Sequence, residues 1–106
     1  MRGTKHLAET TRDGRLVVKI CGITSAAVAQ VAVEAGADAL GFVFWFMSPR
    51  KVDPVRAAAI ARDLPESVLR VGVFVDAPLD EMKRVADEVG LDLLQHLIHA
   101  VDHLGR

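Results

Sequence analysis

Four short apolar runs, separated by helix-like segments, constrain the fold of this 106-residue chain more than any other feature. The runs cover residues 16–21, 38–44, 68–75 and 91–95. Near-continuous apolar strands are typical of parallel sheets, because helices cover both faces and leave neither exposed to water. The order of the segments therefore predicts an α/β fold with a parallel βαβαβαβ arrangement.

The segments between these runs carry the start and stop signals of helices. Residues 25–35 are rich in Ala and Val and are followed by Gly36, a common helix stop. Asp53 can cap a second helix with Pro54 at its first position. Residues 79–89 form a third, amphipathic pattern. We therefore expect three helices, each connecting two strands.

The residues after the first strand give no support to a nucleotide-binding α/β fold. Cys21-Gly22-Ile23-Thr24 matches neither the dinucleotide-binding fingerprint nor a Walker loop. Right-handed crossovers permit an open doubly wound sheet or a section of a barrel, and the absence of a nucleotide motif favours the barrel. We expect residues 1–15 to be a mobile polar leader and residues 16–106 to form the folded domain.

Composition and charge exclude several classes of partner. The formal net charge is −1, so there is no basic surplus for binding nucleic acid. No apolar run approaches the roughly 18 residues that a membrane span requires, and the N-terminus lacks the apolar core of a signal peptide. A single cysteine without a targeting segment indicates a reducing cytoplasm. The sequence predicts a cytoplasmic protein that binds neither nucleic acid nor membrane.

Cys21 is the only cysteine, and it ends the first predicted strand just before a glycine. Pockets of parallel α/β proteins lie at the carboxyl ends of the strands, where reactive groups are held. Two interpretations remain open: a small buried apolar residue, or a thiol with a chemical role. Lys19 shares the strand face of Cys21, so its ammonium group either tunes that site or is paired there.

Three segments, taken in order and spacing, resemble the phosphoribosylanthranilate isomerase family. The segments are Val18-Lys19-Ile20-Cys21-Gly22-Ile23-Thr24, residues 34–44 followed by Ser48-Pro49-Arg50, and Arg70-Val71-Gly72-Val73-Phe74-Val75. The resemblance covers residues 17 to about 95. The fold of the family is a (β/α)8 barrel of about twice this length, so the resemblance implies the N-terminal half of a TIM barrel.

The resemblance implies an aldose–ketose isomerase of tryptophan biosynthesis, an intramolecular oxidoreductase, with no cofactor and no metal. Its substrate would be N-(5-phosphoribosyl)anthranilate, a phosphorylated sugar joined to anthranilate, which undergoes an Amadori rearrangement. The general base of the family falls on Cys21. The arginine near the anthranilate carboxylate falls on Arg50, whose planar fork suits a carboxylate. Lys19 and Gln95, the latter at the end of the fourth predicted strand, are further candidates for substrate binding.

The second half of the family's barrel provides its general acid and phosphate site. We therefore expect at most a trace of activity from this chain alone, since each acid–base group contributes about 10²–10⁴-fold. The resemblance stops at Gln95, which is followed by His96-Leu97-Ile98-His99. A natural truncation, a frameshifted reading or an engineered half-barrel would each give this pattern.

The last residues and one loop carry features with two interpretations each. Residues 97–104 are expected to form a last helical turn or two. His96, His99 and His103 fall at positions i, i+3 and i+7, a spacing that would put them on one helix face, and we expect them to be solvated rather than metal ligands. The apolar loop Trp45-Phe46-Met47 covers either an aromatic ligand or another copy of the chain.

A half-barrel has two open strand edges and an uncovered inner face, and open edges pair readily with other chains. We therefore expect a homo-oligomer, either a dimer whose halves close one barrel or a domain swap. This expectation supports a second functional hypothesis, in which the chain is a non-catalytic, self-assembling (βα)4 scaffold.

Overall fold

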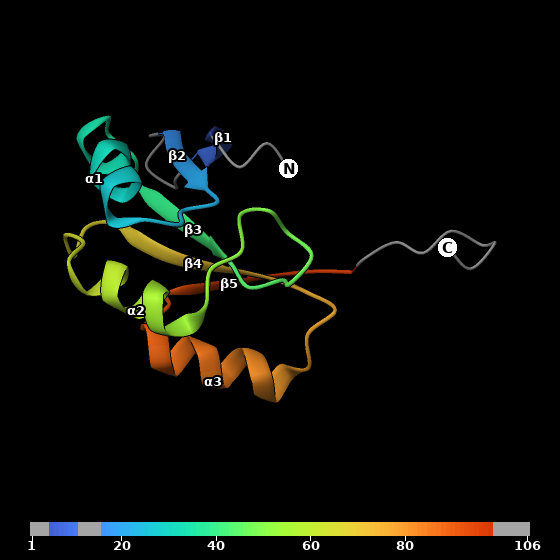
Figure 1. Cartoon of the computed structure of the whole chain (residues 1–106). Helices are drawn as coiled ribbons and strands as arrows, with labels where there is room; N and C mark the ends of the chain where they lie inside the picture. The colour runs from blue at the N-terminus through green and yellow to red at the C-terminus, as the bar shows by residue number, and fades with distance from the viewer. Residues whose placement is uncertain (1–4, 11–15, 99–106) are drawn as a thin grey trace.

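The computed structural model describes residues 5–10 and 16–98, with side chains from residue 17 onward. Its strands form one sheet in the order β1-β2-β3-β4-β5, and β2 to β5 run parallel (Figure 1). A helix follows each of β2, β3 and β4, which confirms the predicted βαβαβαβ arrangement. The strands are β1 (Lys5–Thr10), β2 (Leu16–Cys21), β3 (Ala39–Val43), β4 (Leu69–Val75) and β5 (Leu93–Leu97); the helices are α1 (Ala26–Glu34), α2 (Pro54–Arg62) and α3 (Leu79–Val89).

Side-chain caps fix where the first two helices begin. The Ser25 hydroxyl accepts a hydrogen bond from the backbone N–H of Val28 at 3.2 Å, and α1 begins at the next residue. The Asp53 carboxylate accepts from the N–H of Arg56 at 2.8 Å, and α2 begins with Pro54. Each cap satisfies a backbone donor that has no partner inside the helix. These short caps set the positions of the loops that precede the helices.

The two faces of the sheet bury different residues, as the period of two along a strand requires. Leu40, Phe42 and Phe74 face the helices and belong to the main core. The opposite, inner face carries a smaller buried cluster of Cys21, Val43 and Val73, with Trp45 packed against it. The remaining buried residues of the main core are Ile23, Ala29, Ala32, Ala37, Val52, Ala57, Ile60, Ala61, Val68, Met82, Val85 and Val89.

Strand β1 lies in the stretch where the sequence analysis predicted a leader and no strand. It runs antiparallel to β2, with Lys5 opposite Ile20 and Thr10 opposite Leu16. The edge of β2 is therefore paired, and the prediction of two open edges on the parallel sheet is wrong for this edge. The strand was missed because the sequence of Lys5–Thr10 is mostly polar and lacks the apolar run that marked the other strands.

The last strand lies two residues later than predicted. Asp92 uses its backbone N–H and its carboxylate to bind the backbone of Arg70, so β5 begins only at Leu93. It extends to Leu97, whose carbonyl accepts a hydrogen bond from the N–H of Asp76 at 2.9 Å. The helix predicted for residues 97–104 is wrong at its first residue, and its residues from 99 onward lie outside the described part of the chain.

The same pair of hydrogen bonds joins β2 to β3 and β4 to β5 at the amino ends of the strands. The Asp38 N–H donates to the Val18 carbonyl at 2.8 Å, and the Asp38 carboxylate accepts from the Val18 N–H at 2.9 Å. Asp92 makes the equivalent bonds to Arg70 at 2.7 and 2.8 Å. We call each arrangement an aspartate clasp. Both clasps join neighbouring strands at the end of the sheet where the strands begin, opposite their carboxyl ends.

In the described part of the chain, none of the three helices combines the length and the apolar character that crossing a bilayer requires.

Candidate active site

Cys21 lies at the carboxyl end of β2, on the inner face of the sheet, and is 1% exposed. The next residue, Gly22, has a positive φ of 88°, a conformation that glycine adopts without strain. The N–H groups of Gly22 and Ile23 both donate to the Gly41 carbonyl at 3.0 Å, which turns the chain away from the sheet. The thiol therefore sits at the strand end that the sequence predicted.

The space around the thiol depends on Gly41 of β3, the register partner of Cys21. A Cβ atom at Gly41 would lie 2.9 Å from the Cys21 Sγ and 3.3 Å from its Cα. Such contacts are closer than packed atoms tolerate. Only a residue without a Cβ atom therefore leaves room at position 41 for the Cys21 side chain.

Burial raises the pKa of the Cys21 thiol from its ordinary value of 9.0, because a buried thiolate loses the water that stabilises it. The positive charge of Lys19 and the backbone N–H of Gly22 act in the opposite direction, and burial is the larger effect. The thiol is thus protonated at neutral pH, with two groups beside it that favour the thiolate.

Lys19 and Gln95 meet on the inner face although β3 and β4 lie between their strands. The Lys19 ammonium donates a hydrogen bond of 2.6 Å to the Gln95 Oε1. The bond crosses the concave side of the sheet, where Ala39 of β3 is the register partner of Lys19 and Val73 of β4 is the register partner of Gln95. Two of the four predicted site residues are therefore paired, and the third, Cys21, lies two residues along the same strand.

Arg50 lies in the loop between β3 and α2, at the carboxyl end of the sheet, and is half-buried. Ser48 organises this loop: its hydroxyl accepts from the Arg50 N–H at 3.1 Å, and its carbonyl accepts from the Lys51 N–H at 3.2 Å. The loop is anchored to β3 by the Val52 N–H, which donates to the Val43 carbonyl at 3.0 Å. This role of Ser48 was not predicted from the sequence, although serine hydroxyls often bind the backbone N–H two residues ahead, which is the spacing of Ser48 and Arg50.

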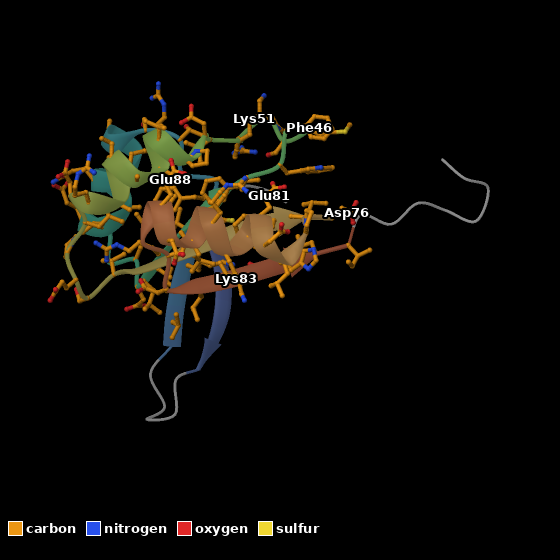
Figure 2. The ribbon with its side chains drawn as sticks, turned by 90° about the horizontal axis from the view of Figure 1, so that it is seen from below. Phe46, Lys51, Asp76, Glu81, Lys83 and Glu88 are labelled. Atoms are coloured by element: carbon orange, nitrogen blue, oxygen red, sulfur yellow. The ribbon has the colours of Figure 1, made fainter. Side chains whose placement is uncertain are left out.

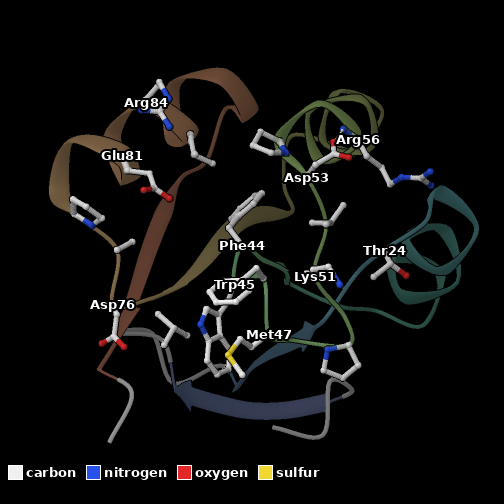
Figure 3. Close-up of a pocket in the computed structure, with 18 residues that line it drawn as sticks. Thr24, Phe44, Trp45, Met47, Lys51, Asp53, Arg56, Asp76, Glu81 and Arg84 are labelled. Carbon is white, nitrogen blue, oxygen red and sulfur yellow. Dashed lines mark hydrogen bonds between the residues drawn. The ribbon is translucent and has the colours of Figure 1, made fainter. Parts of the chain in front are cut away.

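A cavity of about 1070 Å³ opens among the loops at this end of the sheet (Figure 3). Its walls come from the loops after β2, β3 and β4 and from the first turns of α2 and α3. Charged side chains line it, including Lys51, Asp53 and Glu81. The four predicted site residues are not among its lining residues, so this cavity adjoins the inner-face site and does not contain it.

Trp45 connects the cavity with the inner face. It lines the cavity and also packs against the cluster that contains Cys21. Phe46 and Met47 are instead 79% and 62% exposed, and Phe46 points away from the body of the molecule (Figure 2). All three residues of the predicted apolar loop therefore line the cavity, but only Trp45 also packs against the buried cluster of the inner face, whereas Phe46 and Met47 are largely exposed to solvent.

The first of the three histidines lies on a strand and not on the predicted helix face. His96 is exposed on β5, opposite Phe74 in the register, while His99 and His103 lie outside the described residues. Within residues 5–10 and 16–98, no three His, Cys, Asp or Glu side chains are grouped in a way that could hold a metal ion.

Comparison with known proteins agrees with this geometry. The family model of N-(5'-phosphoribosyl)anthranilate (PRA) isomerase matches residues 18–102. The chain belongs to the PRA isomerase family. The PRA isomerase of Geobacter sp. strain M21 is 62% identical over 78 residues, which are 74% of this chain and 38% of that relative.

Solved PRA isomerases have the same fold over the matched part. One, in complex with reduced 1-(o-carboxyphenylamino)-1-deoxyribulose 5-phosphate, is 44% identical with a TM-score of 0.75, over 77% of this chain and 42% of that one. Another consists of monomers generated from the dimeric enzyme of Thermotoga maritima, at 41% identity and a TM-score of 0.72, over 79% and 43%. The chain thus spans about two fifths of the length of these PRA isomerases, and the prediction of a half TIM barrel is confirmed.

Proposed function

We propose that this chain supplies the part of a PRA isomerase that carries the general base. The observation that carries the proposal is the position of Cys21, buried on the inner face at the carboxyl end of β2 and inside the family's Lys-Ile-Cys-Gly motif. Active sites of (β/α)8 barrels lie at this end of the strands. Membership of the family supports the reaction type.

In the completed barrel, a general acid from the missing half opens the ribose ring of N-(5-phosphoribosyl)anthranilate to a protonated Schiff base. The Cys21 thiolate then takes the proton from C2, and the electron pair of that C–H bond moves toward the iminium nitrogen. The enol-amine formed in this way tautomerises to the aminodeoxyribulose phosphate. In that tautomerisation the Cys21 thiol gives its proton to C1, and the conjugate base of the general acid takes the proton of the C2 hydroxyl. Both groups thus regain their starting protonation states within one turnover, so no oxidant, metal or cofactor enters the balance.

Three further residues have proposed roles in binding the substrate. Arg50 would bind the anthranilate carboxylate through its planar fork. Lys19 and Gln95 would exchange their mutual hydrogen bond for contacts with the substrate, since both polar groups already point into the concave side. A PRA isomerase that binds a reduced carboxyphenylamino-deoxyribulose phosphate supports a ligand with both a carboxylate and a phosphorylated sugar.

The isolated chain should have at most a trace of this activity. In the family, the acid and the phosphate site belong to the part of the barrel that this chain lacks. The matched segment covers only 38% of the Geobacter relative and 42% of the solved complex. The raised pKa of Cys21 adds to the deficit, because a protonated thiol removes no proton.

The deciding experiment is turnover of phosphoribosylanthranilate, followed by the loss of its fluorescence. The chain is assayed alone and together with the remaining segment of the Geobacter relative, made as a separate polypeptide. We expect no turnover by the chain alone, turnover by the pair, and loss of turnover on Cys21→Ala.

Val43→Ala is the matched control, because Val43 packs in the same buried cluster without carrying a reactive group. It should lower stability and leave turnover measurable. Equal turnover by the Cys21→Ala pair and the wild-type pair would refute the assignment of the base.

A non-catalytic scaffold is the second candidate, and the β5 edge favours it. Leu93 is 52% exposed on the inner face beside this edge, and Leu97 is also exposed. We infer that copies of the chain associate through this edge in a reducing cytoplasm, where Cys21 stays a thiol. A folded oligomer that gains no turnover from the added half would favour the scaffold over the isomerase.

A further inference from the structure

Strand β1 comes from outside the part of the chain that belongs to the family. The family model begins at residue 18, within β2, whereas β1 covers Lys5–Thr10. Its pairing with β2 is antiparallel, unlike every other pairing of the sheet. Figure 1 shows β1 beside β2, at the end of the sheet away from β5.

The edge that β1 occupies is the one that a closed barrel needs. In a (β/α)8 barrel all strands are parallel, and the first strand pairs with the last so that no edge remains. The first strand of the family is β2 of this chain, because the family match starts there. One β-strand edge accepts one neighbour, so β1 and a closing parallel strand exclude each other.

We propose that the edge of β2 is a docking surface for a parallel strand from a second barrel half, and that β1 is a displaceable guard that covers this surface in the isolated chain. The partner is thus defined by its chemistry: a strand with free backbone N–H and C=O groups that runs parallel to β2 and is followed or preceded by a helix. The guard prevents the same edge from pairing with unrelated strands.

Three features of β1 favour its displacement from β2. Its register shifts between Leu7 and Glu9, so the ladder is interrupted within six residues. Among the strands that the structure describes, β1 is the outermost and has a neighbour on one side only. The short connection to β2 gives it an effective concentration on the order of millimolar, which a partner that also covers the inner face can exceed.

A reversible cross-link tests the proposal in the full chain. Leu7 and Val18 are register partners, and opposed residues of an antiparallel pair lie within the range that a disulfide spans. Leu7→Cys with Val18→Cys, in a Cys21→Ser background that removes the only native thiol, therefore fixes β1 on β2 when oxidised and releases it when reduced. The probe is the remaining segment of the Geobacter relative, and binding is measured by sedimentation velocity and hydrogen exchange.

We expect the reduced chain to bind the probe and the oxidised chain to bind it at least about tenfold more weakly, because apparent affinity falls with the fraction of chains that have a free edge. Amide protons of β1 should lose protection when the reduced chain binds, while those of β2 keep theirs. Leu7→Cys alone in the same background is the control, and oxidant should leave its binding unchanged.

Equal binding by the oxidised and reduced chains, or continued protection of β1 in the complex, would overturn the proposal. Failure of both forms to bind would also overturn it, since the released edge would then accept no strand. These readouts contain no turnover, so they are independent of whether Cys21 is the catalytic base.

Discussion

At the scale of single residues, Cys21 is held between two opposing influences. Burial in a cluster of apolar side chains disfavours its thiolate, whereas Lys19 and the Gly22 N–H favour it. The hydrogen bond to Gln95 holds the Lys19 ammonium group in its position. A ligand that took over the hydrogen bond of Gln95 would release the Lys19 ammonium group and so alter the pKa of Cys21.

Replacing Lys19 should raise the pKa of Cys21 further. Lys19→Met keeps the length of the side chain and removes the positive charge that stabilises the thiolate. The ultraviolet absorbance of the thiolate measures this pKa without interference, since the chain has one cysteine and no tyrosine. Lys83→Met, at an exposed position on α3, is the matched control, and an equal rise in both variants would contradict the role of Lys19.

The raised pKa of Cys21 should also make stability fall at alkaline pH. Between the ordinary thiol pKa of 9.0 and the higher pKa of the folded state, the unfolded chain has lost the proton that the folded chain retains. Unfolding is therefore favoured as the pH rises through this window, and the stabilisation is fully present below it. Urea unfolding should show a steeper alkaline decline for the wild type than for Cys21→Ala, and parallel declines would contradict the shift.

Gly41→Ala should destabilise the fold by about 1–3 kcal/mol, the usual cost of forcing extra atoms into a packed site. The new Cβ would meet the Cys21 Sγ at 2.9 Å. Combining it with Cys21→Ala removes the closest contact, so the double variant should lose less free energy of unfolding than the sum of the single variants. Simple additivity would indicate that Gly41 matters for another reason.

At the scale of elements, predictability from sequence depended on whether the signal was local. The sequence predicts α3 at its observed bounds, and α1 and α2 to within a few residues, because caps and stops are local. It does not predict β1, whose pairing with β2 rather than an apolar pattern makes it a strand. The start of β5 was displaced because Asp92 serves the clasp with Arg70.

The candidate site follows the same rule. The period of two places Cys21 and Lys19 on one face, and a motif places Arg50 at the carboxyl end of the sheet. The contact between Lys19 and Gln95 depends on the curvature of the sheet, which no local pattern encodes. The separation of Trp45 from its two exposed neighbours depends equally on how the loop packs.

The bond between Lys19 and Gln95 should couple β2 energetically to β5. Hydrogen bonds to charged groups contribute about 1.5–3 kcal/mol when well buried, and this one is partly buried, so a coupling energy near 1 kcal/mol is expected. A double-mutant cycle with Lys19→Met and Gln95→Leu in urea unfolding measures it. A coupling indistinguishable from zero would show that the two side chains do not meet in solution.

At the scale of the whole molecule, the sheet has one edge covered by β1 and another, that of β5, without a neighbour in the described part of the chain. A dimer in which two copies close one barrel requires β5 of one copy to reach β2 of the other. Strand β1 occupies that place. Association of this chain with itself should therefore proceed through β5 while β1 stays docked.

Charges on the inner face beside β5 should weaken self-association. Leu93→Lys with Leu97→Lys places two ammonium groups next to the unpaired edge, a device by which natural edge strands avoid pairing. We expect the apparent mass in sedimentation to depend on concentration for the wild type and to stay monomeric for this variant. Val31→Lys is the control, because Val31 lies on α1, away from the β5 edge, and is 64% exposed. This variant should associate like the wild type.

The two aspartate clasps have a consequence for how such a chain can grow. Each clasp joins the two strands of a βαβ unit by the same reciprocal bonds, Asp38 to Val18 and Asp92 to Arg70. Because each βαβ unit contains its own clasp, a duplicated unit can be added to the chain without changes in the unit before it. The loops at the other end, where Cys21 and Arg50 lie, are then free to diverge.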